Sequence, residues 1–212
     1  MDLIIKIALY APPILLAITL HEVAHGWTAR YFGDPTAASL GRLSLNPIKH
    51  IDPVGTIAVP TILLILGGFL FGWAKPVPVN MLRLNDPKRD MALVAAAGPA
   101  SNFVMALIWA FVMKMGYISD SELMRLILIE MGKVGLLINL ILMVLNLIPI
   151  PPLDGGRVLS GVLPDHLSIA LARIEPYGMF IIFGLLAFGV LRIVLEGPLT
   201  FFQSIITKFV GL

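Results

Sequence analysis

Two histidines and a glutamate lie within one helical turn, in the segment His21-Glu22-Val23-Ala24-His25. Residues four apart project from the same face of a helix, so His21 and His25 can bind one metal ion through neutral imidazoles. Glu22 points about 100° further round the helix, where it stays free to act as a base on water. The spacing is typical of zinc hydrolases. The alternative is a pair of buried histidines or a proton relay, because ionisable groups inside membranes also serve these purposes.

A catalytic zinc ion needs a third protein ligand and keeps one position open for water. The chain has no cysteine, which leaves His, Asp and Glu as ligands. The best candidate is Asp154, which follows a proline-rich break at the end of an apolar segment. Irregular backbone at membrane depth is tolerated only where it is buried in protein or lines a wet cavity, so Asp154 should face inward. The alternative is that Asp154 caps the helix that starts at Gly155. Weaker candidates, all in polar loops or at helix ends, are Asp165, His166 and Glu175.

The composition places these residues in a membrane protein. Hydrophobic residues make up 58% of the chain and charged residues 13%, against about 25% charged in soluble domains. The mean hydropathy is +0.93. Most of the apolar segments are close to the 20 or so residues that cross a bilayer as a helix; they are residues 11–29, 55–73, 91–115, 135–150 and 177–195. We therefore expect an all-α polytopic membrane protein with about five or six transmembrane helices.

The remaining segments are expected outside the hydrocarbon. Residues 199–210 have Phe and Ile at helical spacing with Gln, Ser and Lys opposite, which predicts a helix lying on the membrane interface. Residues 119–130 predict a linker helix outside the membrane. No cleavable signal precedes the first apolar segment, so we expect it to remain in the mature protein. Basic residues between positions 75 and 89 predict that this loop is cytoplasmic.

At this point the chain resembles the site-2 protease family of intramembrane zinc metalloproteases. The resemblance rests on HEVAH in an apolar segment, followed far downstream by Asn146-x-x-Pro149 and by Asp154-Gly155 after the break. It extends over nearly the whole chain through GRLSLNPIKHIDPVGT at residues 41–56, GWAKPVPVN at residues 72–80 and AGPASN at residues 97–102. Together these motifs are highly specific.

The resemblance implies a role for each candidate residue. His21, His25 and Asp154 would bind one Zn²⁺ per chain, and Glu22 would be the general base. Asn146 would stabilise the oxyanion or hold the substrate. For Asn146 the alternative is a hydrogen bond between helices, a common use of Asn in membranes.

Asn102 fits such a structural role better, so we expect it to be structural. Many relatives also carry a PDZ or CBS-type domain, and no segment here is long and polar enough to form one. We therefore expect residues 1–212 to form a single integral-membrane metalloprotease domain, similar to the compact, core-only branch of the family.

A protease that cuts a transmembrane helix must hold part of it in an extended form. The alternation of Leu43 and Leu45, and of Val77 and Val79, with other residue types predicts two short strands. Proline on both sides of Val77 restricts the second strand to an edge, where the substrate could bind by strand addition. The alternative is that both segments are irregular re-entrant loops near the site.

The sequence thus predicts a zinc-dependent endopeptidase that cleaves transmembrane segments of membrane proteins, as in regulated intramembrane proteolysis. The expected location is the cell membrane of a prokaryote, with transmembrane proteins and the lipid bilayer as partners and no nucleic acid. The alternative is a membrane carrier or ion pathway in which the His, Glu and Asp side chains relay protons or metal. A tightly bound stoichiometric zinc favours the protease, whereas flux across vesicles favours the carrier.

Overall fold

The computed structural model describes residues 3–65 and 72–212, and in these ranges it contains helices but no β-strand. Four of the described helices are long and apolar enough to cross a membrane: α1 (Leu3–Tyr31), α4 (Pro87–Tyr117), α5 (Glu122–Asn146) and α9 (Val190–Val210). A fifth span is formed if α7 (Asp165–Ala172) and α8 (Glu175–Ala187), bent by 64° at their junction, cross together. The all-α polytopic architecture is confirmed.

Short helices connect these spans. They are α2 (Thr36–Ser39), η1 (Pro47–His50), η2 (Pro53–Ala58), α3 (Val59–Ile65), η3 (Met81–Arg83) and α6 (Asp154–Val162). The expected span at residues 55–73 corresponds to most of η2, all of α3 and a stretch, residues 66–71, that lies outside the described residues. Residues 72–80 have no regular secondary structure and lead into η3.

Three expected segments have boundaries that differ from the sequence prediction. The predicted linker helix at residues 119–130 is not separate, because the Oγ of Ser121 accepts from the N–H of Met124 and starts α5, which continues unbroken to Asn146. The predicted interface helix at residues 199–210 is the second half of α9. The expected span at residues 177–195 is instead divided at Gly189, whose φ of +71° suits a residue without a side chain and separates α8 from α9.

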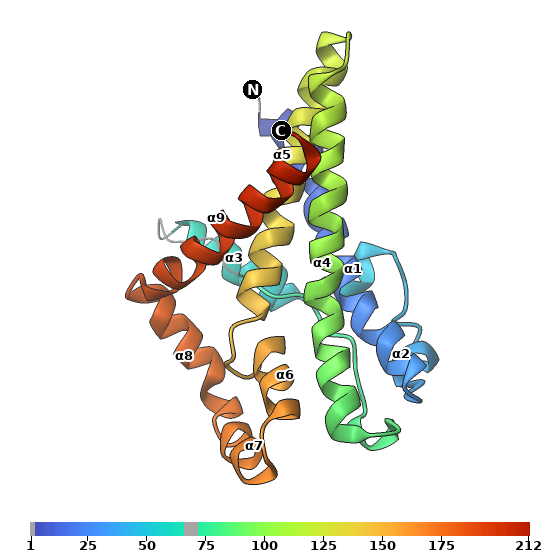
Figure 1. Cartoon of the computed structure of the whole chain (residues 1–212), viewed down its shortest axis with the longest axis vertical. Helices are drawn as coiled ribbons and strands as arrows, with labels where there is room; N and C mark the ends of the chain where they lie inside the picture. Colours follow the sequence, from blue (N-terminus) through green and yellow to red (C-terminus); the bar gives the residue numbers. More distant parts are fainter. Residues whose placement is uncertain (1–2, 66–71) are drawn as a thin grey trace.

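Helices α4 and α5 form an antiparallel pair in the middle of the molecule, and α1, α6 and α9 pack around them (Figure 1). The pair approaches closely because Gly132 and Gly135 of α5 face α4. A Cβ at Gly135 would lie 2.2 Å from the Cγ of Trp109, and one at Gly132 would lie 2.5 Å from the Cβ of Met113. Small residues allow such contact between membrane helices, where packing replaces the hydrophobic effect.

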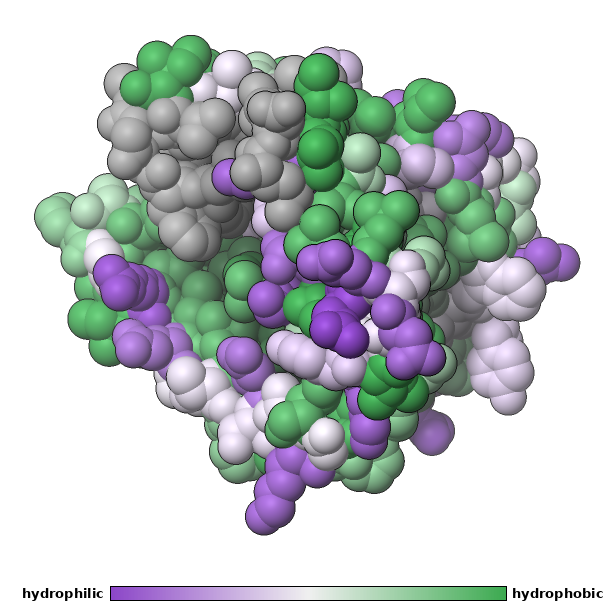
Figure 2. Space-filling model, turned by 90° about the horizontal axis from the view of Figure 1, so that it is seen from above, coloured by the Kyte–Doolittle hydropathy of each residue, from purple (hydrophilic) through white to green (hydrophobic). Residues whose placement is uncertain are grey.

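Polar and apolar side chains are distributed as a membrane protein requires. Figure 2 views the molecule from the end at which α4 joins α5, and hydrophilic residues lie in the middle of this face and in smaller groups toward its edges, with hydrophobic residues between them. Many large apolar side chains along the spans are exposed, among them Ile108 and Phe111 of α4 and Leu137 of α5. In a bilayer these side chains contact lipid.

Candidate metal centre

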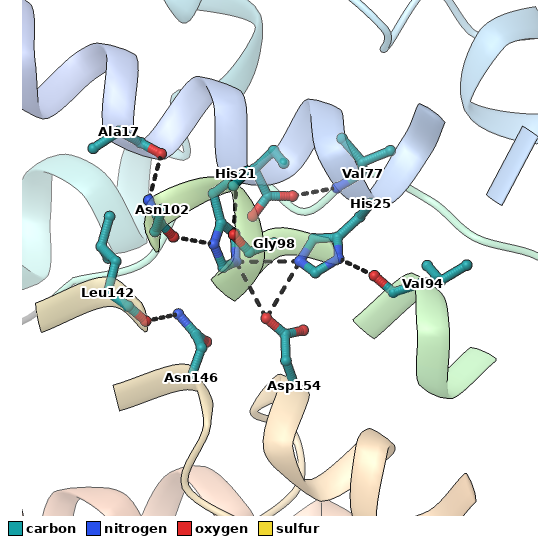
Figure 3. A network of polar contacts seen from close by, with 12 residues as sticks. Ala17, His21, His25, Val77, Val94, Gly98, Asn102, Leu142, Asn146 and Asp154 are labelled. Carbon is teal, nitrogen blue, oxygen red and sulfur yellow. Dashed lines mark hydrogen bonds and ion pairs between the residues drawn. The ribbon is translucent and has the colours of Figure 1, made fainter. Parts of the chain in front are cut away.

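Three ligand atoms meet between α1 and α6 (Figure 3). The Nε2 atoms of His21 and His25 are 3.1 Å apart. The Oδ2 of Asp154 lies 3.2 Å from the first and 3.3 Å from the second. Ligands about 2.0–2.1 Å from a tetrahedral zinc ion are separated by about 3.3–3.4 Å, so the triangle has nearly the size that zinc requires. Three ligands also leave the fourth position open.

The surroundings of this triangle favour a cation. His21 and His25 are 7% and 9% exposed, and the buried Oδ2 of Asp154 has no hydrogen-bond donor within the described residues. The Nδ1 atoms of both imidazoles contact carbonyl oxygens, which accept only, so Nδ1 carries the proton and Nε2 presents a lone pair. Three buried lone pairs that face one another repel unless a cation lies between them. The donor set therefore fits zinc.

The chain places Asp154 through the turn between α5 and α6. Asp154 is the first residue of α6, and the cap position before it is taken by Leu153, so the alternative role of Asp154 as the helix cap is not observed. The two glycines that follow let the turn fold back on the helix. A Cβ at Gly155 would lie 2.3 Å from the carbonyl oxygen of Leu147, and one at Gly156 would lie 2.4 Å from the nitrogen of Pro151. Larger residues here would push Asp154 away from the histidines.

Helix α4 holds both histidines from the opposite side. The Nδ1 of His25 is 2.7 Å from the carbonyl oxygen of Val94, and the Nδ1 of His21 is 2.5 Å from the Oδ1 of Asn102. Between these two contacts lies Gly98, where a Cβ would be 2.4 Å from the Nε2 of His25 and 2.7 Å from the Cε1 of His21. Gly98 was not predicted as a residue of the site, and Asn102 was predicted to be purely structural.

Glu22 lies between the two histidines in sequence and contacts a different part of the chain. Its Oε2 accepts a hydrogen bond of 2.8 Å from the N–H of Val77, in the irregular segment 72–80. The side chain of Val77 is buried beside Gly26, where a Cβ would be 2.9 Å from the Cγ1 of Val77. This segment therefore lies directly beside the motif helix.

The predicted strands are wrong, and the alternative of irregular loops is correct for the described residues. Pro76 and Pro78 have no N–H, and the N–H groups of Val77 and Asn80 are taken by side chains: that of Val77 by Glu22 and that of Asn80 by the Oδ2 of Asp34, at 2.6 Å. Few backbone donors remain for a sheet.

The remaining predicted site residues are Asn146 and the weaker ligand candidates. Asn146 is the last residue of α5 and donates from Nδ2 to the carbonyl oxygen of Leu142 at 2.9 Å (Figure 3). Two of the three weaker ligand candidates lie elsewhere in ion pairs: Asp165 contacts Lys88 at 2.7 Å and Glu175 contacts Arg157 at 3.9 Å.

Apolar helices long enough to cross a membrane surround a buried triangle of His, His and Asp, an arrangement that could hold a metal ion. Comparison with known proteins agrees: the model of Peptidase family M50 matches residues 10–118 and 112–189. The chain belongs to this family, which is that of the site-2 proteases. It is a multi-pass integral membrane zinc metalloprotease.

Individual relatives of the chain are also named as zinc metalloproteases. The chain is 39% identical over 173 residues to "Putative zinc metalloprotease YwhC" of Bacillus subtilis, covering 80% of this chain and 75% of that protein. It is 31% identical over 189 residues to "Putative zinc metalloprotease Rip2" of Mycolicibacterium smegmatis, covering 81% of this chain and 64% of that protein. No solved structure matches the chain.

Proposed function

We propose that His21, His25 and Asp154 hold the catalytic zinc ion, that Glu22 is the general base and that Asn146 stabilises the oxyanion or holds the substrate. The observation that carries the proposal is the triangle of ligand atoms, with sides of 3.1 to 3.3 Å, in which both histidines come from α1, the helix that also presents Glu22. We further propose that residues 1–212 act as one catalytic domain.

The general base is supported by the contacts of its carboxylate. Zinc, when bound, lowers the pKa of a coordinated water toward about 7 and polarises the scissile carbonyl. Glu22 takes the proton from the attacking water and delivers it to the leaving amine. Its Oε2 is held by the N–H of Val77, and this contact leaves Oε1 for the water.

Asn146 can donate a hydrogen bond from its side-chain amide to the oxyanion that forms at the scissile carbonyl. The amide has two N–H groups, of which one donates to the carbonyl oxygen of Leu142. The other is free to donate to an oxyanion, which is the transition-state interaction that such donors supply. Replacing Asn146 by Ala should therefore lower kcat while zinc stays bound.

The substrates that we propose are transmembrane segments of membrane proteins, cut as in regulated intramembrane proteolysis. Two of the ligands lie on the spanning helix α1 and the third on α6, which packs against the spanning helix α4, so a scissile bond reaches them from within the bilayer. A helical substrate must unwind where no water replaces its hydrogen bonds. One Gly in place of Leu near the cut favours unwinding by about 1 kcal/mol, or about fivefold in rate.

The test uses purified protein in lipid vesicles with a panel of single-span substrates in matched Leu and Gly forms. We expect one zinc per chain, cleavage mapped by mass spectrometry to sites within the span, and faster cleavage of the Gly forms. Zinc-loaded protein that cuts none of the substrates, or that instead carries protons or metal across the vesicle, would contradict the protease proposal. Equal rates for both forms would refute unwinding as the slow step.

A further inference from the structure

Two asparagines are completely buried beside the metal centre. Asn102 of α4 and Asn139 of α5 are both 0% exposed, inside helices that span the membrane. Burying an amide away from water is unfavourable unless its polar atoms find partners. Every polar atom of both side chains does so, and the partners form a chain that ends on a zinc-ligand candidate.

The chain of contacts starts in the backbone of α5. The Nδ2 of Asn139 donates to the carbonyl oxygen of Gly135 at 2.8 Å, which turns its Oδ1 toward α4. Asn102 donates from Nδ2 to this Oδ1 at 2.9 Å and to the carbonyl oxygen of Ala17 at 3.2 Å. The Oδ1 of Asn102 then contacts the Nδ1 of His21 at 2.5 Å.

These contacts allow only one orientation of the Asn102 amide. A flipped amide would direct its oxygen toward two acceptors, the Oδ1 of Asn139 and the carbonyl oxygen of Ala17, and lose both hydrogen bonds. Only an acceptor can therefore face His21, so the proton of this imidazole stays on Nδ1 and its Nε2 is free for metal. His25 obtains the same tautomer from the backbone carbonyl of Val94, which no substitution removes directly.

We propose that Asn102 is a positioning residue that fixes the tautomer and ring orientation of His21, and that Asn139 fixes Asn102. The inference rests on the proposed zinc site and extends it to α5, which contributes no ligand. Partners of metal-bound histidines typically change metal affinity by about 10-fold to 100-fold when they are removed.

The test measures the zinc dissociation constant of purified protein in detergent by competition with a chelator, together with the thermal unfolding of the zinc-free protein. Asn102→Leu should raise the dissociation constant about 10-fold to 100-fold. Asn139→Leu should raise it by a smaller factor. Thr19→Val is the control, because Thr19 is equally buried on α1 and its hydroxyl has no partner within the described residues; it should leave zinc affinity unchanged.

The double variant separates a relay from two independent packing effects. If Asn139 acts through Asn102, adding Asn139→Leu to Asn102→Leu should not weaken zinc binding further. Effects that multiply in the double variant would overturn the relay. A lower unfolding temperature with unchanged zinc affinity would reduce both residues to a packing role.

Two further outcomes keep the test decisive. Should Asn102→Leu not fold, a folded Asn139→Leu that binds zinc as wild type does would overturn the relay. Wild-type protein without tight zinc binding would refute the proposed zinc site itself, and this result is distinct because the assay needs no cleavage.

Discussion

The Oε2 of Glu22 and the backbone N–H of Val77 are joined by a hydrogen bond of 2.8 Å across 55 positions of the sequence. The Glu22 carboxylate has few competing backbone donors in this segment, because neither Pro76 nor Pro78 carries an N–H. The bond fixes one oxygen of the carboxylate and thereby aims the other.

Removing this N–H should reduce catalysis without removing zinc. In Val77→Pro the donor is lost, and hydrogen bonds to charged groups contribute about 1.5–3 kcal/mol, so we expect kcat to fall about 10-fold to 100-fold. Val77→Ala keeps the N–H and is the matched control, with a smaller loss. Cleavage kinetics with zinc content measured in parallel provide the check. Equal activity of the two variants would mean that the bond does not position Glu22.

Glu22→Gln should abolish proteolysis and leave zinc and the fold intact. Gln fills the same space and can still accept from the N–H of Val77, but it cannot take a proton from water. Zinc content, thermal unfolding and cleavage are compared with wild type. Activity above about 1% of wild type would exclude Glu22 as the base, since losing general-base catalysis costs about 100-fold or more.

Asp154→Ala should lower zinc occupancy, because two histidines alone make a poor zinc site. Asp165→Ala is the matched control: this carboxylate lies on the next helix and contacts Lys88, so its removal should leave zinc content unchanged. Metal analysis of both purified variants decides the matter. A full complement of zinc in Asp154→Ala would show that Asp154 is not a ligand.

Gly98→Ala should disturb the site although Gly98 carries no functional group. Its methyl group would lie 2.4 Å from the Nε2 of His25, where the ligand atoms converge, so we expect zinc affinity to fall by at least about tenfold. The control is Gly184→Ala on α8, where a Cβ meets nothing within 4 Å. Unchanged zinc binding in Gly98→Ala would require α4 to move away at little cost.

Local spacing made part of the site predictable from the sequence. His21 and His25 share a face because they are four residues apart on a helix, and no tertiary information is needed for that conclusion. Asp154 was identified because a proline-rich break inside an apolar segment restricts where an acid can lie. The structure places Asp154 beside both histidines.

Features set by contacts between distant segments were not predictable in this way. The bond from Asn102 to His21 depends on how α4 packs on α1, and an apolar pattern does not specify the rotation of either helix. The predicted strand at Val77 failed because a carboxylate on α1 takes its N–H, which a pattern of alternating residues does not reveal. Helix ends were misplaced where capping by Ser121 extended α5 beyond its apolar part.

The ligand triangle joins two helices that otherwise pack on a common neighbour. His21 and His25 belong to α1 and Asp154 to α6, and both helices pack against α4. A metal ion shared by α1 and α6 would cross-link the two ends of a loop that contains the spans α4 and α5, as a disulfide does in a secreted protein. Its binding free energy would then also be folding free energy. The three ligand side chains would thus serve both catalysis and the packing of α1 and α6 against α4.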